Sequence, residues 1–544
     1  MRRLARVLIQ CLFPVALLGC AAKAPLAAQP ASPTPVPATP SPDAALTVFI
    51  SDLHFGLGKR ANGQWHPLED FRWSKALEGF LDEISRRSGN RTILVIAGDF
   101  FEMWQHPSVP CASGTPDLGC TVAEMEEVAR LIVQGHRGDL EALGAFASRG
   151  ENRLVVIPGN HDAALLLPTV WQIAADAFRA TPGRVERVSA NVWISPDGRV
   201  VAEHGHQMPG EDVNGYKDWP RVTKRRQGRE FMLRPWGEQF VHRLYNEVED
   251  RYSLIDNLIP QSKGIGHYLE ERGTWGSGLD IARFIAFNLT QTSIRQIGAL
   301  GDSPGQPPRW DVARSRELGW KLFARAMPAD DWYRRQLESG TEPQWQRIRE
   351  QLGSLAGDRQ ATPDDEVKNL CDKRAALATS DAELCPRLDP TLGREILRSL
   401  VPGARLRAVQ KHLKTRRREA TGMTIFIYGH THTLECPARV TPEGLSGFTV
   451  ANTGAFQRLA DDERFRARAS ERNMSPTQAL GELTVEDLPP CYSAVFLTYQ
   501  EGVPKVAVQN WYMPEDQGSG EFVSPTDCRC AKLGSSCEPR PSCN

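Results

Sequence analysis

The sequence has almost no excess charge of either sign. It contains 65 Lys and Arg residues against 66 Asp and Glu residues, a formal net charge of −1 over 544 residues. Nucleic-acid-binding proteins usually carry a basic surface, so the overall charge indicates no specific nucleic-acid partner. An internal repeat is also absent. The balance of 41% apolar and 24% charged residues is ordinary for a globular chain long enough for more than one domain.

Long apolar runs are missing except near the N-terminus. One run extends from about Val7 to Leu18, follows a basic segment, and is too short to span a bilayer as a mature helix. It ends in Leu-Leu-Gly-Cys, which resembles the lipobox of bacterial lipoproteins. The resemblance implies a signal peptide over 1–19 and a lipid on Cys20 that would anchor the protein to a membrane, periplasmic or at the outer membrane. A plain secretory signal is the alternative, and both interpretations predict export.

Cysteine usage agrees with export. Of 12 cysteines, Cys11 would be lost with the signal and Cys20 would be acylated. An even number then remains, which suggests disulfides in an oxidising compartment. Cys111–Cys120 and Cys371–Cys385 are plausible local pairs, but spacing does not determine connectivity. A cysteine-bound zinc site is the alternative for the last four, which lack a clean pair of C-x-x-C elements. The remaining cysteines are Cys111, Cys120, Cys371, Cys385, Cys436, Cys491, Cys528, Cys530, Cys537 and Cys543.

Strand-like and helix-like segments alternate along the first part of the chain. Residues 20–45 are rich in Ala, Pro, Ser and Thr and predict an extended tether. Short apolar runs then alternate with helical periodicity, which predicts an α/β fold with covered sheet faces. The predicted strands are 46–50, 92–97, 153–157, 200–203 and 423–428, and the first predicted helices are 75–87 and 122–146.

The strand pattern is interrupted over 211–420, which is polar and mainly helical in period. We therefore predict a core in two parts, 46–210 and 421–514, separated by a mainly helical insertion or cap. Residues 515–544 are rich in Gly, Ser, Pro and Cys and predict a disulfide-stapled tail. The clearest helical patterns of the insertion are Phe231–Leu258, Leu318–Leu337 and Arg394–Arg418.

Five apolar segments each run into a cluster of Asp, His or Asn. Ligands of open α/β sheets bind at the carboxyl ends of the strands, so these clusters are expected to converge. Imidazole and carboxylate without thiolate favour zinc, iron or manganese. D-x-H and H-x-H spacings place alternate side chains on one side of an extended segment. The clusters are Asp52-Leu53-His54, Gly98-Asp99, Gly159-Asn160-His161-Asp162, His204-Gly205-His206 and Gly429-His430-Thr431-His432.

This ordered series resembles the signature of calcineurin-like metallophosphoesterases over about 46–210 and 421–460. The resemblance implies an α/β/β/α sandwich in four layers and two divalent metals, Mn, Fe or Zn. It also implies hydrolysis of a small phosphorylated substrate by a hydroxide that bridges the metals, which lower the pKa of water toward neutrality. The implied ligands are Asp52, His54 and His432 for one metal, Asp99 as the bridge, and Asn160, His204 and His430 for the other.

The resemblance also implies two catalytic residues. His161 is similar in position to the family's general acid, which protonates the leaving oxygen. Glu102 lies where related phosphatases carry an Asp that orients this histidine; alternatively, Glu102 caps a turn or faces solvent. Met103 stands where phosphoprotein phosphatases carry an Arg, so the substrate clamp of that subgroup is not expected.

Two positions leave alternatives open. His204 and His206 compete for one ligand position; in similar motifs the first His binds the metal, which would leave His206 hydrogen-bonded near the site. The segment Asn452-Thr453-Gly454 resembles the turn that closes many of these sites, and the alternative is a plain glycine turn.

The substrate is not determined by these motifs. Gly98–Trp104 resembles the second motif of the UDP-2,3-diacylglucosamine pyrophosphohydrolase branch. That branch has Arg at the position of His161 and acts on the cytoplasmic side, so its substrate is not carried over. A nucleotide or nucleotide-lipid pyrophosphohydrolase remains the alternative enzyme. A non-catalytic surface lipoprotein that binds a partner through the insertion is the alternative of another class, against which the complete ligand set argues.

Overall fold

The computed structural model divides the chain into two compact units. One comprises Cys20–Pro260 and Leu406–Asn544, and the other comprises Met1–Gly19 and Gln261–Arg405. The second unit lies almost entirely outside the described residues, as do the predicted signal, the tether and the Leu318–Leu337 pattern. The structure describes 46–109, 111, 118–189, 191–209, 215–216, 218–235, 237–238, 241, 246–249, 251–259, 267, 335, 338–341, 346, 349, 404–514, 519–530 and 537.

The first sheet of the larger unit has seven strands in the order β17-β16-β15-β1-β2-β4-β5. The strands β1, β2, β4 and β5 are parallel, and β15 pairs antiparallel with β1. Strands β1, β2 and β4 are buried along almost their whole length, as expected for strands covered on both faces. The bounds are β1 (Leu46–Ile50), β2 (Thr92–Ala97), β4 (Arg153–Ile157), β5 (Val185–Arg187), β15 (Cys491–Gln500), β16 (Val503–Tyr512) and β17 (Glu521–Val523).

The second sheet has five strands in the order β12-β13-β11-β7-β6. Its central strands β13, β11 and β7 are parallel, although β7 and β11 are more than 200 residues apart in the sequence. The bounds are β6 (Trp193–Ile194), β7 (Val200–Glu203), β11 (Ile425–Tyr428), β12 (Leu434–Val440) and β13 (Phe448–Thr453).

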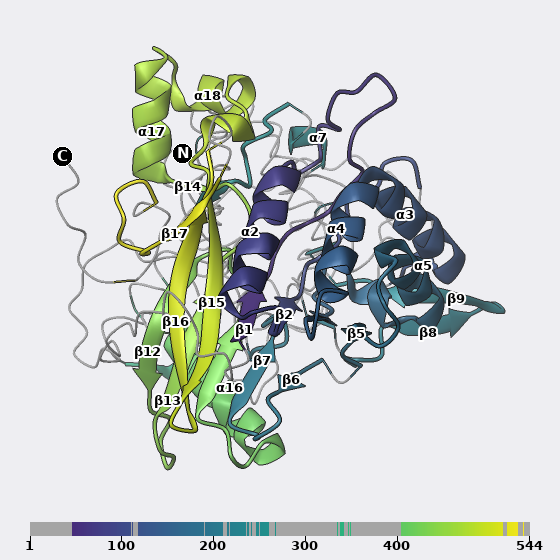
Figure 1. The fold of residues 1–544 in the computed structure, drawn as a ribbon. Coiled ribbons are helices and arrows are strands. Elements are labelled where there is room, and N and C mark those ends of the chain that lie inside the picture. Colours follow the sequence, from purple (N-terminus) through teal and green to yellow (C-terminus); the bar gives the residue numbers. More distant parts are fainter. Residues whose placement is uncertain are drawn as a thin grey trace. The chain divides into compact units, whose positions relative to one another are not determined.

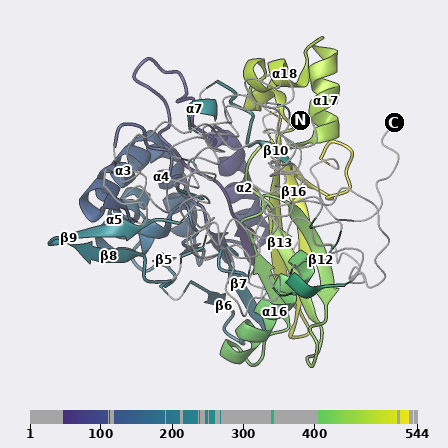
Figure 2. The ribbon, with the colours of Figure 1, turned by 180° about the vertical axis from the view of Figure 1, so that it is seen from behind.

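A hydrophobic core joins the two sheets face to face. Phe49, Val95 and Val155 from the first sheet pack with Ile427 and Ala451 from the second. Because side chains alternate across a strand, the other faces of both sheets are free to pack against helices. Helices α2 (Ser74–Arg87) and α4 (Arg137–Ala147) cover the first sheet, with α3 (Val122–Gly135) and α5 (Pro168–Phe178) beside α4 (Figures 1 and 2).

The second sheet is covered by α16 (Ala404–Glu419). Val409 and Leu413 of this helix pack against Val201, Phe426 and Val450. These three strand residues point away from the core between the sheets. The four-layer α/β/β/α arrangement implied by the sequence is therefore confirmed.

One predicted helix is divided in two. The pattern over 122–146 becomes α3 and α4, which are separated at His136 (φ −114°, ψ 27°). At the end of α3 the backbone of Gly135 passes the backbone of Leu57 so closely that a Cβ at this glycine would lie 2.6 Å from the Leu57 carbonyl oxygen. The close approach of two backbones therefore explains both the glycine and the interruption.

The helical prediction over Phe231–Leu258 is wrong at both ends, where Phe231–Leu233 complete a strand and Leu258 begins another, whereas Asn246–Glu249 is helical. The chain forms a hairpin of β8 (Thr223–Arg226) and β9 (Arg229–Leu233), and β9 also pairs with β3 (Leu118–Thr121). Gln227 and Gly228 have positive φ (49° and 77°), which suits a two-residue hairpin turn. Pairing with a distant strand therefore overrides the local helical period. The rest of the segment contains the short helix α7 (Asn246–Glu249) and β10 (Leu258–Ile259).

The described part of 211–260 belongs to the same compact unit as the core, as does 406–420. Strand β10 pairs with β14 (Ala460–Asp461), which precedes α17 (Asp462–Glu471) and α18 (Pro476–Glu482). The internal segment of the other compact unit, Gln261–Arg405, thus begins about 50 residues after the predicted start of the insertion and ends about 15 residues before its predicted end. The character of the insertion as a whole stays a prediction.

Three disulfides join cysteines of the described residues. The local pair Cys111–Cys120 is present as expected, and Cys371–Cys385 lies outside the described residues. Cys436–Cys537 and Cys491–Cys530 connect the C-terminal tail to β12 and β15. Two of the last four cysteines are therefore paired with distant partners rather than gathered around a zinc ion.

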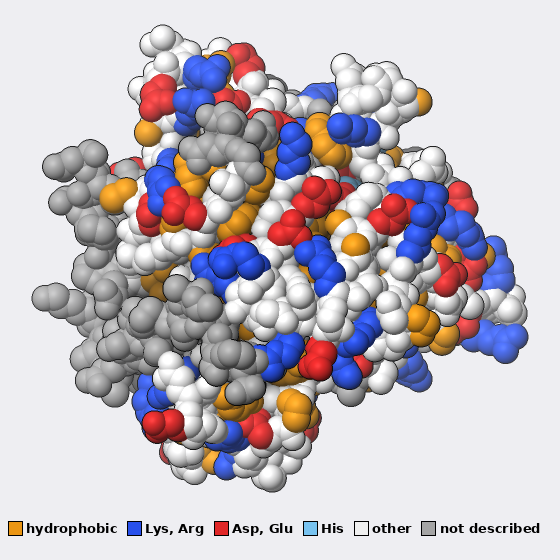
Figure 3. Space-filling view, in the orientation of Figure 1, with side chains coloured by type: hydrophobic (Ala, Val, Ile, Leu, Met, Phe, Trp, Pro, Cys, Tyr) orange, Lys and Arg blue, Asp and Glu red, His pale blue; other side chains and the backbone are white. Residues whose placement is uncertain are grey.

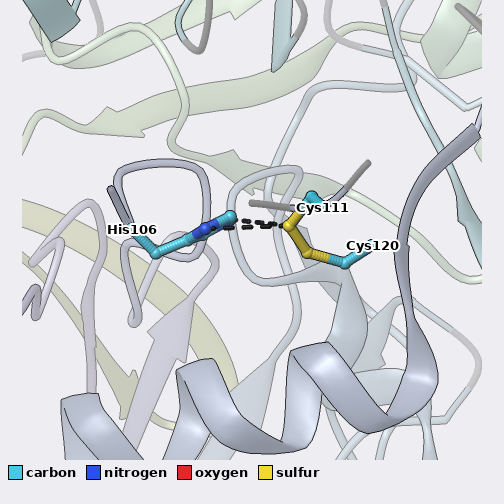
Figure 4. Close-up of side chains that lie close together, drawn as sticks. All are labelled: His106, Cys111 and Cys120. Atoms are coloured by element: carbon cyan, nitrogen blue, oxygen red, sulfur yellow. Dashed lines mark hydrogen bonds between the residues drawn. A yellow bond between two sulfur atoms is a disulfide. The ribbon is translucent and has the colours of Figure 1, made fainter. Parts of the chain in front are cut away.

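The Cys111–Cys120 disulfide lies beside His106. Figure 4 shows the His106 ring pointing at the sulfur of Cys111, with both ring nitrogens 3.7 Å from it. The three residues are close enough to suggest a metal site. However, a metal is bound by thiolates, and these sulfurs are consumed in the disulfide.

The surface carries both signs of charge. Lys and Arg side chains are interspersed with Asp and Glu on the face in Figure 3, in keeping with the net charge of −1. Among the described residues, no helix has both the length and the apolar character needed to cross a bilayer.

A buried charge cluster connects α4 with the loop before α2. The Nε2 atom of His136 lies 3.2 Å from Glu69 Oε2, and its Nδ1 lies 3.0 Å from Asp139 Oδ2. Burial opposes protonation of this imidazole, but Glu69 and Asp139 outweigh burial and raise the pKa of His136 to about 9. The His136 ring also stacks on Phe55, one residue after the first Asp-x-His motif.

We predict that this cluster makes stability fall at alkaline pH. The folded-state pKa of His136 exceeds the unfolded value, so its contribution is complete below about pH 6.5 and is lost as pH rises through about 9. The difference corresponds to about 3 kcal/mol at most. Denaturant unfolding at pH 7 and pH 9.5 should show a larger loss for the wild-type protein than for His136→Gln. Equal losses would contradict this assignment.

Candidate metal centre

The predicted motifs all lie at carboxyl ends of strands. Those following β1, β2 and β4 come from the first sheet, and those following β7 and β11 come from the second. Five of the motif residues turn out of their strands in the left-handed region, which costs a non-glycine residue of order 1–3 kcal/mol each. These residues are Asp52 (φ 54°), His54 (50°), Asp99 (48°), His430 (72°) and His432 (53°).

Two glycines allow the motifs to approach one another. A Cβ at Gly98, which has a φ of 93°, would overlap the imidazole of His204. A Cβ at Gly429 would overlap the side chain of Ser51. The two sheets can therefore bring their motifs together only because these positions have no side chain.

Asp52, His54 and His432 form one group of potential ligands. The Nε2 atoms of His54 and His432 are 3.3 Å apart, and His432 Nε2 is 3.3 Å from Asp52 Oδ1. Ser51 Oγ and the backbone N–H of His430 donate to Asp52 Oδ2, whereas the buried Oδ1 accepts no hydrogen bond. Its lone pairs are therefore available to a cation.

Asp99, His204 and His430 form the second group, with Asn160 beside it. His204 Nε2 lies 2.9 Å from Asp99 Oδ2, 3.0 Å from Asn160 Oδ1 and 3.2 Å from His430 Nδ1. Asp99 Oδ2 is also 3.9 Å from His54 Nε2, so this carboxylate adjoins both groups. Asp99 is thus placed as a bridging ligand would be.

The hydrogen-bond acceptors around His204 and His54 select the imidazole tautomer that can bind a metal ion through Nε2. His204 Nδ1 lies 3.0 Å from the carbonyl oxygen of Ala97, and His54 Nδ1 lies 2.8 Å from Glu102 Oε2. Both acceptors call for a proton on Nδ1, which in a neutral ring leaves Nε2 with a lone pair directed into the site. Carboxylate, amide and imidazole lone pairs that face one another at about 3 Å repel unless a cation lies between them. The donor set therefore fits two divalent metals.

Asp99 and Glu102 remain ionised although they are buried. Burial raises the pKa of Asp99, but His204 and His161 outweigh it and hold this pKa well below its usual range. Burial likewise opposes ionisation of Glu102, yet His161 and His54 lower its pKa to about 2. In the other direction, Asp99 overcomes burial and raises the pKa of His204 to about 9. The site thus favours positive charge, whether protons or metals.

Glu102 connects the metal centre with His161. Its Oε2 lies 2.6 Å from His161 Nδ1 and 2.8 Å from His54 Nδ1, while its Oε1 accepts from the backbone N–H of Trp104. Glu102 is 2% exposed, so it neither faces solvent nor merely caps a turn. The contact with His161 is the one predicted, and the contact with His54 is one that sequence reasoning missed.

The His161 ring is held between other rings. Trp104 stacks on it with centroids 3.9 Å apart, and the His54 ring meets it edge-on at 4.7 Å. The His161 side chain keeps 19% of its surface exposed, more than any other residue described in the centre. It is therefore oriented by buried groups and still open to a ligand. The pairing of Trp104 with His161 has no signal in the sequence.

His206 lies outside both ligand groups. Its ring centroid is 5.4 Å from that of His204 and 4.4 Å from that of Trp219. Burial and the neighbouring His204 and His430 lower the pKa of His206 well below its usual range, so it stays neutral. Of the two competing histidines, His204 is the one that the structure brings to Asp99.

The Asn452-Thr453-Gly454 turn ties the last motif to the first. Asn452 Nδ2 donates to the carbonyl of Gly429 (3.2 Å) and to Thr431 Oγ1 (2.9 Å). The hydroxyl of Thr453 lies 2.6 Å from Ser51 Oγ, next to Asp52. The contact of Thr453 with Ser51 crosses from the second sheet to the first, so this is more than a plain glycine turn.

Sequence reasoning also missed Asp162 and Tyr216. Asp162 accepts from the backbone N–H groups of Phe100 (2.9 Å) and Gly159 (2.5 Å), which joins the second motif to the third. Tyr216 donates its hydroxyl to the carbonyl of Asn160 (3.2 Å). Asp162 could have been found as the fourth residue of Gly-Asn-His-Asp, whereas Tyr216 lies in a segment with no motif.

Comparison with known proteins agrees with this geometry. Residues 46–283 match the model of the calcineurin-like phosphoesterase family. His430 and His432 lie beyond the end of the match, and the pairing of β11 with β7 brings them back to the other motifs. No curated protein matches the chain.

We predict that divalent metals stabilise the protein through Asp99. Chelation should lower the melting temperature, because buried lone pairs then face one another without a cation. Mn²⁺ or Zn²⁺ should restore it in the wild-type protein and much less in Asp99→Asn. Differential scanning fluorimetry with elemental analysis measures both effects. Full recovery and an unchanged metal content in the variant would remove Asp99 from the centre.

Proposed function

We propose that this chain, whose residues 46–283 belong to the calcineurin-like phosphoesterase family, hydrolyses phosphate esters at the centre described above. One observation carries the proposal: two groups of His and carboxylate ligands adjoin at Asp99, and His161 stands beside them on Glu102. Members of this family typically bind two divalent metals, and the donor set here fits that number.

The ligands divide as their contacts suggest. Asp52, His54 and His432 would hold one metal, and Asn160, His204 and His430 the other, with Asp99 shared. Two divalent ions supply Lewis-acid stabilisation of phosphoryl oxygens and acidify water when bound. The chain itself sets their surroundings, because the ligands are almost completely buried and fixed by hydrogen bonds to Ala97, Glu102 and Ser51.

His161 is the proposed proton donor to the leaving oxygen. Burial lowers its pKa, but Glu102 and Asp99 outweigh burial and raise the pKa above its ordinary value, which favours the protonated ring that a proton donor needs. Glu102 fixes Nδ1, which leaves Nε2 as the nitrogen that can give a proton to a substrate. Trp104 covers one face of the ring and excludes water from it.

We also propose that the protein is exported and anchored through Cys20, as the N-terminal sequence predicts. The three disulfides among the described residues support an oxidising compartment. The candidate substrates are therefore phosphorylated compounds outside the cytoplasm. The preference among a monoester, a diester and a pyrophosphate is a question for direct comparison of the three.

We expect protein lacking 1–45 to hydrolyse aryl phosphate esters and to lose this activity on chelation. Asp99→Ala should remove it, because both metals share this carboxylate. Release of aryl alcohol from an aryl phosphomonoester and an aryl phosphodiester, and of nucleoside monophosphate from a nucleotide pyrophosphate, each with and without Mn²⁺, measures both points. Undiminished Mn²⁺-dependent turnover in Asp99→Ala would sink the proposed centre.

We expect His161→Ala to keep its metals and lose turnover by about 10²–10⁴-fold, the usual contribution of a general acid. Glu102→Gln should lose less turnover than His161→Ala. It should also shift the alkaline limb of the pH–rate profile, because the Glu102 carboxylate stabilises the protonated His161 ring. His66→Ala, at a half-buried histidine in the loop before α2 that belongs to neither ligand group, is the matched control and should retain activity. If His161→Ala instead loses metal on elemental analysis, His161 is a ligand and not the acid.

A further inference from the structure

The hydroxyl group of Tyr216 contacts two loops of the proposed centre. It donates to the carbonyl oxygen of Asn160 (3.2 Å), the residue directly before His161. It also forms a hydrogen bond with the side chain of Trp104, whose indole N–H is a donor only and therefore meets the phenol oxygen. One oxygen atom thus connects a predicted metal ligand with the ring that stacks on His161.

Tyr216 is buried, and its surroundings keep it protonated. The residue is 5% exposed. Burial raises the pKa of Tyr216 well above its ordinary value, so the hydroxyl keeps the proton that it donates to Asn160. A buried tyrosine usually finds a partner for its hydroxyl, so the existence of a partner is not informative by itself. The identity of the partners is, because both belong to loops that carry residues of the centre.

The backbone of Tyr216 is held from the fourth motif. The side-chain amide of Gln207 satisfies both of its groups in one orientation. In that orientation its oxygen accepts from the backbone N–H of Tyr216 (2.8 Å) and from Nε2 of His206 (3.2 Å), and its nitrogen donates to the carbonyl of Tyr216 (3.2 Å). The ring of Trp219 lies 5.4 Å from the Tyr216 ring between centroids. Tyr216 is therefore fixed through its main chain before its hydroxyl reaches the other two loops.

Trp104 is held at its backbone and at its indole. Its backbone N–H donates to Oε1 of Glu102 (2.7 Å), and its indole meets the hydroxyl of Tyr216. The other oxygen of Glu102 lies 2.6 Å from Nδ1 of His161. Glu102 therefore fixes the His161 ring and the backbone of Trp104. Tyr216 fixes the far end of the indole, which covers the His161 ring at 3.9 Å between centroids.

We propose that Tyr216 is a positioning residue for proton transfer from His161. It holds the indole of Trp104 over the His161 ring and the backbone of Asn160 next to it, so that Nε2 of His161 keeps its direction toward the leaving oxygen. In that step the bond between phosphorus and the leaving oxygen breaks, the electron pair stays on this oxygen, and the proton of Nε2 moves to it. The inference rests on the proposed function and refines it, since it assigns a role to a residue outside the five motifs.

The proton matters most for a leaving oxygen that is a strong base. Phenolate is such a group, whereas 4-nitrophenolate departs readily without a proton. A residue that positions the proton donor should therefore matter for phenyl phosphate and much less for 4-nitrophenyl phosphate. Loss of a merely structural contact would slow both esters by the same factor. The comparison of the two esters thus separates positioning from structural support.

The experiment measures kcat and KM of the full chain with Mn²⁺ on both esters, for the wild-type protein and for Tyr216→Phe, which removes only the hydroxyl. We expect kcat on phenyl phosphate to fall by about 10–100-fold, a part of the roughly 10²–10⁴-fold that a general acid contributes, and KM to change little. On 4-nitrophenyl phosphate kcat should stay within about threefold of the wild-type value. Elemental analysis should find the metal content unchanged. The melting temperature should fall by no more than about 2–4 °C, the effect of one lost hydrogen bond.

A second variant removes the same contact from the other side. Trp104→Phe keeps a ring against His161 but has no indole N–H. It should show the same difference between the two esters. Adding Tyr216→Phe to it should cost less than Tyr216→Phe costs in the wild-type protein, because the contact is already lost. If Tyr216→Phe does not fold, Trp104→Phe decides by the comparison of the two esters.

Tyr499→Phe is the matched control, since it also removes a hydrogen-bonded tyrosine hydroxyl. The partner of that hydroxyl is Ser195. Tyr499 follows Leu497, which pairs with Thr47 near the start of β1, at the opposite end of that strand from the site. The rates of this variant on both esters should equal those of the wild-type protein.

Three results would each overturn this role of Tyr216. They are equal losses on the two esters, an unchanged kcat on phenyl phosphate, and loss of metal from Tyr216→Phe. The first and the last would make Tyr216 a structural support of Asn160. A wild-type protein that hydrolyses neither ester would contradict the proposed function and the role of Tyr216 with it, so the two failures are distinguishable.

Discussion

The buried carboxylate of Asp99 is the point on which both halves of the site depend. One oxygen faces His204 from the second sheet and, farther off, His54 from the first, while the other accepts the backbone N–H of His161 (2.9 Å). A carboxylate can hold this position only if positive charge surrounds it, and the imidazoles and the fitted metals supply that charge. The left-handed turn at Asp99 and the bare Gly98 beside it exist to permit this approach.

The strands and the motifs that follow them could be predicted from the sequence, because each is encoded by a short continuous segment. The strands β1, β2, β4, β7 and β11 are short and mostly apolar, and each is followed by its polar motif. Glu102 could be connected to His161 because related sequences place a carboxylate at that offset. Its contact with His54 could not be predicted, because only the packing of the loops after β1, β2 and β4 brings His54, Glu102 and His161 together. The same holds for Trp104 on His161.

In the segment after His206, the helical prediction failed at β9 because this strand pairs with a strand far away in the sequence. The residues of β9 have a period compatible with a helix, but β9 satisfies its backbone with β8 and β3. The parallel strands β7 and β11 pair although they lie far apart in the sequence. Parallel neighbours need a crossover connection in any case, and the entropic cost of lengthening that connection grows only slowly with its length.

The position of β1 has a mechanical consequence. This strand is the first described element, and it is paired along both edges, parallel to β2 and antiparallel to β15. A pull on the chain ahead of Leu46 would therefore load these hydrogen bonds in shear, all at once, instead of opening them one by one. The loop that carries Asp52 and His54 begins at the far end of the same strand. Tension applied to the N-terminal segment would therefore reach the site only after the pairing of β1 with both neighbours had given way.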